Sequence, residues 1–218
     1  MIVTRFKHLQ TKVSNDIPLE KIVDAIQNDT NIKGLTLKYR ELKSAEKNEE
    51  AKNIKKSLLP AFAPAVQLRG GKSRNDIFDI TGLCFLDIDN ISTDEMTNAI
   101  DLLKSDNHIV IFYKSLSGTG LHIIIRYSLF FGENQTQISL TPTRIRKVYG
   151  AVFKTISKKY RTLLNLEIDK SGENPERLCL ISHDSEIYFN KDAKPIIYKY
   201  KNQRSTKIFK TFEEINLD

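Results

Sequence analysis

The sequence is organised around one short stretch, Leu83-Cys84-Phe85-Leu86-Asp87-Ile88-Asp89-Asn90. Its apolar run predicts a buried strand that carries two carboxylates at its end. Alternate residues of a strand share a face, and i to i+2 spans roughly 6.6 Å, so Asp87 and Asp89 are expected to point the same way. Parallel carboxylates repel unless a cation lies between them, and their oxygens suit hard ions such as Mg²⁺ and Mn²⁺. The alternative is a strand that runs into an acidic turn, because Asp-x-Asp-Asn is also common in turns.

The composition is that of a globular protein with a real core. The chain has 218 residues, of which 40% are hydrophobic and 28% are charged. No apolar run is long enough to cross a bilayer, and residues 1–6 lack the apolar segment of a signal peptide, so we expect a cytoplasmic protein with no membrane partner. The two cysteines, Cys84 and Cys179, exclude a disulfide scaffold and a four-cysteine zinc module, so no zinc is expected.

The charge balance favours a polyanionic partner. Lys and Arg number 34 against 27 acidic residues, a formal net charge of +7, and basic side chains gain by displacing counterions around phosphates. A Lys-rich proteome would give the same balance. The loop at residues 69–74 carries Arg69, Lys72 and Arg74 beside two glycines, and is a candidate nucleic-acid contact. A plain surface turn is the alternative.

Strand and helix patterns alternate along the chain, which predicts an α/β fold. Apolar periodicity predicts strands near residues 2–6, 65–68, 83–88, 108–113, 121–125 and 177–182. Helices are expected from about residue 16 to 26, over 38–59, after the Ser92/Glu95 capping box, and from Thr141 to Tyr160 with Pro142 in its first turn. Residues 128–140 are expected to form a loop, and the basic tail after residue 198 a linker.

A Gly-rich turn precedes the most informative histidine. It contains Ser115, Ser117, Gly118, Thr119 and Gly120, and His122 follows on a predicted strand. Glycines permit close approach, and backbone N–H groups in such a loop can surround phosphate oxygens. The alternative is an ordinary hairpin followed by a structural histidine.

A third acid and an arginine follow downstream. Asp169 ends the short stretch Leu166-Glu167-Ile168-Asp169 and could add a carboxylate to the first pair. Arg177 could neutralise a phosphate, or could form a surface salt bridge.

The order of these motifs resembles the archaeo-eukaryotic primase superfamily, the primase-polymerases. The likeness is closest to the VirE N-terminal-like branch, found on bacterial mobile elements and in CRISPR-associated primase-polymerases. Four segments carry it, over roughly residues 55–192: 56–61, 82–90, 115–125 and 168–184.

The resemblance implies roles for individual residues. Asp87, Asp89 and Asp169 would hold two divalent ions, Mn²⁺ or Mg²⁺, while His122 and the loop that includes Ser115 and residues 117–120 would bind the incoming nucleoside triphosphate. Arg177 would contact phosphate, and Ser182 is a further nucleotide-binding candidate. Gly120 departs from the family pattern, because many primases have Ser at this position.

The predicted function is therefore a DNA-dependent primase-polymerase, an enzyme that transfers NTP or dNTP units to a 3′-hydroxyl on a single-stranded template, with primer synthesis as a further expectation. The resemblance implies a two-lobe fold: a core over 1–198, with an N-terminal α/β lobe at roughly 1–80 and an RRM-like catalytic sheet at roughly 81–198. The tail, 199–218, would lead to a further domain or to replication or CRISPR proteins. Alternatives are a non-catalytic DNA-binding replication initiator and a metal-dependent glycosyl or nucleotidyl transferase using the Asp-x-Asp pair.

Overall fold

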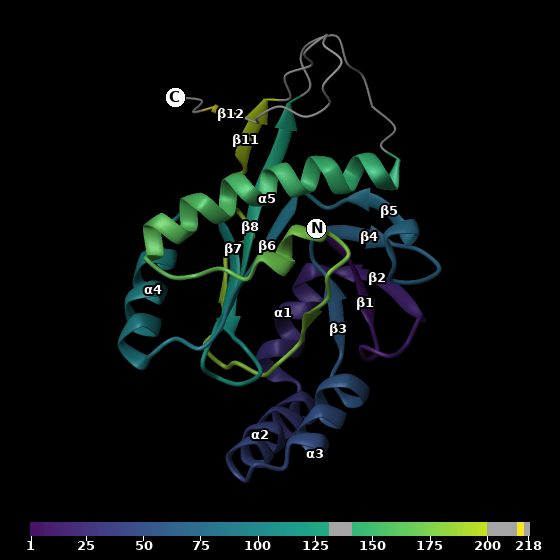
Figure 1. The fold of residues 1–218 in the computed structure, drawn as a ribbon, viewed down its shortest axis with the longest axis vertical. Helices are drawn as coiled ribbons and strands as arrows, with labels where there is room; N and C mark the ends of the chain where they lie inside the picture. Colours follow the sequence, from purple (N-terminus) through teal and green to yellow (C-terminus); the bar gives the residue numbers. More distant parts are fainter. Residues whose placement is uncertain (131–140, 200–212, 216–218) are drawn as a thin grey trace.

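The fold centres on an antiparallel sheet in which β8 lies between β6 and β7 (Figure 1). The computed structural model describes residues 1–130 and 141–199, and the backbone of 213–215. β6 (Leu83–Ile88), β7 (Ile109–Lys114) and β8 (Leu121–Phe130) form the centre. β10 (Tyr188–Phe189) pairs with β7, while β11 (Ile196–Lys199) pairs in parallel with the end of β8 and leads to β12 (Glu213–Ile215). β6, which carries Asp87, and β8, which carries His122, are thus direct neighbours in the sheet.

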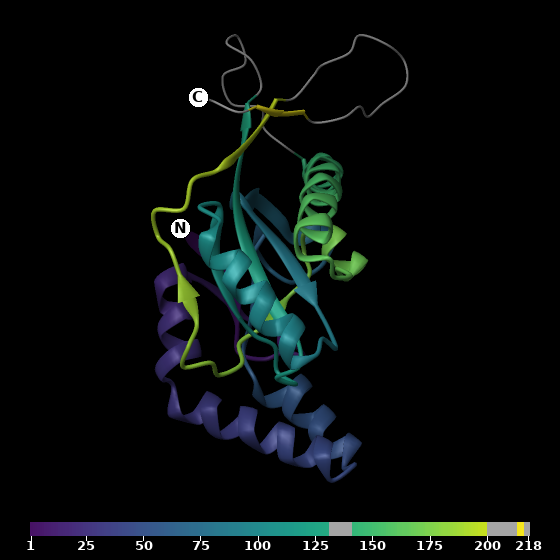
Figure 2. The same cartoon turned by 90° about the vertical axis from the view of Figure 1, so that its left-hand side faces the viewer.

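The two faces of this sheet bury different cores, as the period of two requires. The face with Cys84, Leu86 and Ile88 packs against α4 (Thr93–Ser105) and α5 (Pro142–Leu164). The face with Leu83 and Phe85 packs against the N-terminal part of the chain. Figure 2 shows α1 and α5 on opposite sides of the sheet. Asp87 lies on the Phe85 face, so it points toward the N-terminal part and away from α4 and α5.

A second sheet, in the order β2-β1-β3-β9, brings β9 from the C-terminal third of the chain beside three strands from its N-terminal third. It contains β1 (Ile2–Phe6), β2 (Ser14–Pro18), β3 (Ala61–Ala63) and β9 (Cys179–Leu180). Three helical elements and a π-helical turn follow β2: α1 (Leu19–Asn28), α2 (Thr30–Ser44), α3 (Asn48–Asn53) and η1 (Ile54–Leu58). The hairpin β4 (Val66–Leu68) and β5 (Ile77–Ile80) encloses the short helix η2 (Arg74–Asp76), and η3 (Lys170–Glu173) follows α5.

Local signals located the strands β1, β4, β6, β7 and β8 and the helices α1, α4 and α5, but β2, β3, β5, β10 and β11 were not expected. The mixed α/β class is confirmed, as are the first strand and the N-terminal caps of α4 and α5. The single helix expected over 38–59 was wrong: the chain breaks after Ser44, with Glu46 at φ 57, and resumes as α3 and η1. The loop expected from 128 was wrong for its first three residues, which continue β8.

Two further expectations concern the C-terminal third. The strand expected over 177–182 is only the two-residue β9. The expected linker begins inside β11, since Lys199 ends that strand; residues 200–212 and 216–218, like 131–140, lie outside the described residues. β9 pairs with β3, so a late segment completes the N-terminal sheet. The lobe boundary near residue 80 stays a prediction, and so does a primase-type fold in particular. Among the described residues, none of the helices combines the length and apolar character needed to span a bilayer.

Candidate metal centre

Three carboxylates from distant parts of the sequence converge at the end of β6. One oxygen each from Asp87, Asp89 and Asp169 lie within 4.8 Å of one another. A backbone hydrogen bond, in which the Asp169 N–H donates to the Asp87 carbonyl over 2.9 Å, holds the two segments together. Oδ1 of Asp87 is buried and has no hydrogen-bond partner among the described residues, and Asp87 is only 6% exposed. A buried carboxylate oxygen with spare acceptor capacity suits a cation ligand.

Arg177 already supplies one positive charge to this cluster. Its Nη2 lies 3.1 Å from Oδ2 of Asp87 and 3.0 Å from Oδ2 of Asp169. The guanidinium therefore bridges two of the acids from the side, as an ion pair with hydrogen bonds. Arg177 was expected to contact phosphate; here it contacts the carboxylates.

The acids differ in their electrostatic surroundings. Partial burial, together with the charges of Asp87 and Asp169, raises the pKa of the Asp89 carboxyl above its usual range. For Asp169, burial acts in the same direction, but hydrogen bonds from Ser171 and the charge of Arg177 outweigh it and lower the pKa. Repulsion within the cluster is thus incompletely relieved at Asp89, where a bound cation would relieve it.

His122, on β8, lies beside Asp87, on β6. The two residues are cross-strand partners, and Nε2 of His122 lies 3.4 Å from Oδ1 of Asp87. This separation is long for a hydrogen bond, so Oδ1 keeps its acceptor capacity. Nδ1 lies 3.4 Å from Sγ of Cys179, and the ring packs edge-on against Phe85 and Tyr113. Burial lowers the pKa of His122 against the opposing effect of Asp87, so the ring is neutral near pH 7.

The Gly-rich turn adjoins the same strand end. The Ile91 N–H donates to the Thr119 carbonyl over 2.9 Å. A Cβ on Gly120 would penetrate the Ile88 carbonyl and press on the Asp89 Cα, which explains why no serine occupies this position. The turn therefore packs its backbone directly on the segment that carries Asp89.

Several donors and acceptors of the Gly-rich turn are already hydrogen-bonded within the turn. Hydroxyl groups form a chain from Ser115 to Ser117, 3.1 Å, and from Ser117 to Thr119, 3.0 Å. The Gly118 and Thr119 N–H groups, expected to be open to phosphate, donate to the Ser115 carbonyl and the Ser117 hydroxyl. Ser117 and Thr119 are exposed, so their hydroxyls remain accessible to a ligand.

The remaining predicted residues lie apart from the acids. The buried Ser182 hydroxyl donates to the Lys114 carbonyl over 3.1 Å. Arg69 stacks on the Phe78 ring, 3.2 Å from its centroid, and Lys72 donates to the Leu9 carbonyl. Arg74 is exposed in η2. The structure thus brings together Asp87, Asp89, Asp169, His122, Arg177 and the Gly-rich turn, and leaves the others outside that cluster.

Two basic residues near the site were missed. Arg40 donates from Nε to the Leu116 carbonyl over 3.1 Å and from Nη2 to the Ser115 carbonyl over 3.3 Å, so α2 supports the Gly-rich turn. Lys55, in η1, acts on the site through its charge, which lowers the pKa values of Asp89 and His122. Only the π-helical turn, a feature often found at functional sites, could have drawn attention to Lys55, and it is not visible in the sequence.

Fold and site together define a mixed α/β domain whose carboxylate cluster could hold a metal ion. Residues 53–189 match the family described as BT4734-like, N-terminal domain, and the chain belongs to this family. The matched segment contains the acids, His122, the Gly-rich turn and Arg177. No curated protein and no solved structure matches the chain.

Proposed function

We propose that this chain is the catalytic core of a DNA-dependent primase-polymerase that transfers nucleotides to a 3′-hydroxyl. The observation that carries the proposal is the convergence of Asp87, Asp89 and Asp169 beside His122 and the Gly-rich turn. This arrangement combines oxygen ligands for divalent ions with a loop able to contact phosphates, as nucleotidyl transfer requires. The motif order that resembles primase-polymerases supports the same reading.

The three carboxylates are the proposed ligands, and the bridging of Asp87 and Asp169 by Arg177 indicates that they already attract positive charge. Two bound Mn²⁺ or Mg²⁺ ions would activate the attacking 3′-hydroxyl and stabilise the leaving pyrophosphate. His122, the cross-strand partner of Asp87, would limit the orientations open to the Asp87 carboxylate by packing beside it. This role differs from a triphosphate contact, because His122 is 7% exposed and faces Asp87.

The phosphate contacts are assigned to exposed groups. Ser117 and Thr119 present hydroxyls at the turn, and Arg40 fixes the turn from α2. Arg177, one-third exposed at its side chain, would exchange a carboxylate contact for a phosphate once ions neutralise the acids.

Primer extension with Mn²⁺, together with de novo synthesis on a single-stranded template, tests the proposal. Wild-type protein is expected to incorporate nucleotides, and Asp87→Ala/Asp89→Ala is expected to lose incorporation. Glu49→Ala/Glu50→Ala removes two exposed acids from α3 and serves as the charge-matched control. Wild-type inactivity with both dNTPs and NTPs, or full activity in the Asp87/Asp89 variant, would refute the proposal.

A non-catalytic DNA-binding module is the second candidate. The observation in its favour is that Arg177 gives two of the acids a protein cation, so they could be structural. DNA binding without a divalent ion and without nucleotide incorporation would favour it.

A further inference from the structure

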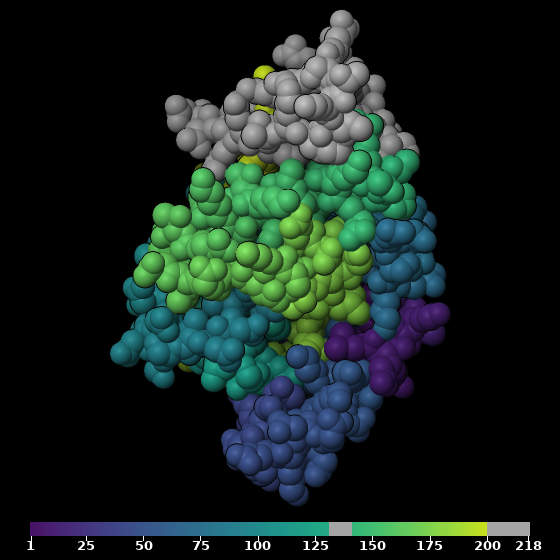
Figure 3. Space-filling view, in the orientation of Figure 1, coloured from purple at the N-terminus to yellow at the C-terminus, as the bar shows by residue number. Residues whose placement is uncertain are grey.

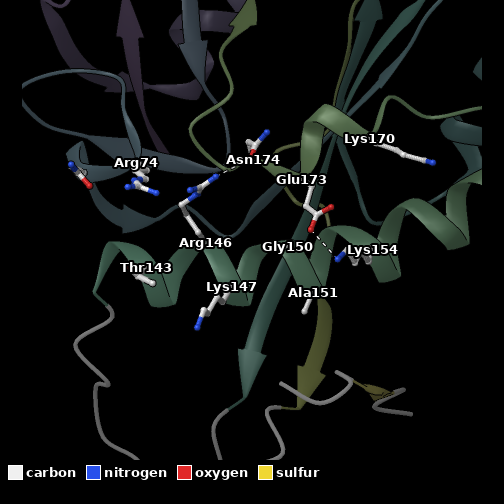
Figure 4. A pocket seen from close by; sticks show the side chains of 11 residues that line it. Arg74, Thr143, Arg146, Lys147, Gly150, Ala151, Lys154, Lys170, Glu173 and Asn174 are labelled. Atoms are coloured by element: carbon white, nitrogen blue, oxygen red, sulfur yellow. Dashed lines mark hydrogen bonds and ion pairs between the residues drawn. The ribbon is translucent and has the colours of Figure 1, made fainter. Parts of the chain in front are cut away.

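A polar concavity lies between α5 and the segments η2 and η3 (Figure 4). Its volume is about 630 Å³, and it is bordered by α5, by η3 with Asn174, and by Arg74 and Asn75 of η2. Figure 3 shows α5 and the segment that follows it side by side on one face of the molecule. We call this feature the α5 groove. Its lining residues include the cations Arg74, Arg146, Lys147, Lys154 and Lys170.

The helix contributes one continuous face to the groove. Thr143, Arg146, Lys147, Gly150, Ala151 and Lys154 follow the spacing of three and four residues that places side chains on one side of a helix. The middle of this face consists of the small residues Gly150 and Ala151, and the Glu173 side chain packs over Gly150. Along the helix, Arg146 and Lys147 precede these two residues and Lys154 follows them.

Positive charge exceeds negative charge around the groove. Among the described lining residues, Glu173 is the one acid, and it pairs with Lys154 at 2.9 Å. Arg146 is held by the Asn174 side chain at 3.0 Å and by Glu176 at 3.4 Å. These contacts fix two cations along the groove, while Arg74, Lys147 and Lys170 are exposed. Fixed and exposed cations in a row suit a ligand with repeated negative charges.

The groove adjoins the carboxylate cluster through a single segment. Asp169 caps η3, and Lys170 follows it directly. Asn174, which lines the groove, accepts the Arg177 N–H at its carbonyl over 3.0 Å. The segment 169–177 therefore carries Asp169 and Arg177, which belong to the carboxylate cluster, together with Lys170 and Asn174, which line the groove.

We propose that the α5 groove binds the sugar–phosphate backbone of single-stranded DNA. The positive charge of the groove indicates a polyanionic ligand, and η3 links the groove to the carboxylate cluster. The choice of DNA as that ligand rests on the proposed function. Among the described residues that line the groove, none has an aromatic side chain on which a base could stack. The lining cations would contact phosphates, and such contacts carry no base-sequence information.

The test measures binding of a fluorescein-labelled oligo(dT) to the full chain in EDTA by fluorescence anisotropy over a series of salt concentrations. Arg74→Gln/Lys147→Gln/Lys170→Gln is expected to weaken binding at least about tenfold, and to reduce the salt slope by about two, since each phosphate contact on a single strand contributes roughly 0.7. Lys21→Gln/Lys33→Gln/Lys38→Gln, which removes three exposed cations from α1 and α2, should match the wild type.

Unchanged affinity and slope in the groove variant, equal losses in both triple variants, or no oligonucleotide binding by the wild type would overturn the proposal. Lys170→Gln alone, expected to lower the slope by about 0.7, covers the case in which the triple variant fails to fold. Asp87→Ala/Asp89→Ala should keep its binding in EDTA. A protein that binds through the groove but never incorporates nucleotides would thus refute the proposed function and leave this inference standing.

Discussion

Asp169 and Asp87 are joined through their backbones, because the Asp169 N–H donates to the Asp87 carbonyl over 2.9 Å. This bond fixes the separation of two side chains that would otherwise repel each other. Arg177 then bridges the same two carboxylates through Nη2. The protein therefore holds its acids in place before any ion binds, and the energetic consequences can be measured at each of the residues involved.

Replacement of Arg177 should expose the repulsion between the acids. Arg177→Gln is expected to lower the free energy of unfolding by about 1–3 kcal/mol without divalent ions, the smaller values reflecting its partial exposure. Mn²⁺ should then raise Tm more in the variant than in the wild type, because an ion replaces the lost charge. Thermal unfolding with and without Mn²⁺ measures both effects. Arg161→Gln, which breaks an ion pair with Glu167 outside the site, is the control; equal Mn²⁺ shifts in both variants would contradict the prediction.

Gly120 should tolerate no side chain. A Cβ there would collide with the Ile88 carbonyl, so Gly120→Ala is expected to destabilise the protein by about 1–3 kcal/mol and to displace Asp89. Gly34→Ala, in α2, is the matched control: no atom of the described residues lies within 4 Å of the position a Cβ would take, so the change should be neutral or stabilising by up to about 1 kcal/mol. Chemical denaturation compares the two, and equal stabilities would argue against the close packing of the turn on β6.

The raised pKa of Asp89 gives the ion-free protein an unusual pH dependence. In the folded protein this carboxyl binds its proton at a higher pH than in the unfolded chain. Its contribution to stability therefore grows as pH falls through the folded pKa and is complete below the unfolded value, about 3.9. Denaturation in EDTA at several pH values measures the free energy of unfolding of wild type and of Asp89→Asn. The difference between these two free energies should become smaller as the pH falls. A gap that widens toward acid would reverse the assigned sign.

Metal binding should show the opposite trend. Protons compete with a cation for the Asp89 carboxylate, so the apparent Mn²⁺ affinity is expected to fall as the pH decreases through the raised pKa of Asp89. Titration calorimetry at several pH values measures this loss. An affinity that does not change with pH, or binding that survives Asp87→Ala/Asp89→Ala, would place the ion elsewhere.

Both thiols should be inert in the folded protein. Cys84 and Cys179 are free and buried, and burial raises the pKa of Cys84 to about 12 and that of Cys179 further. A thiol-disulfide reagent at about pH 8 is therefore expected to react only as fast as the protein unfolds, because the thiolate is the reactive form. Labelling kinetics with and without denaturant measure this. Rapid labelling of either thiol under native conditions would show that the sheet around it opens locally.

Sequence patterns predicted the features that depend on neighbouring residues. The period of two in β6 placed Asp87 and Asp89 on the same side, and the Ser92/Glu95 capping box placed the start of α4. These signals are local, so a single sequence contains them. The roles given to these residues in catalysis stay predictions.

Other features depend on contacts between distant segments. The break after Ser44 requires a positive φ at Glu46, a residue with no preference for it, so periodicity alone favoured a longer helix. Arg40 reaches carbonyls of the Gly-rich turn from α2, and no spacing rule connects the two. The use of Arg177 as a bridge also became visible only when β6 and η3 were placed side by side.

The pairing of β9 with β3 has a consequence for synthesis of the chain. The N-terminal sheet gains its last strand from Cys179 and Leu180, and Asp169 and Arg177 lie just before them. A nascent chain that has emerged only as far as α5 has neither a complete first sheet nor the third carboxylate. The cluster should therefore assemble late on the ribosome, so a prematurely terminated product would lack the metal-holding arrangement even if its early strands had folded.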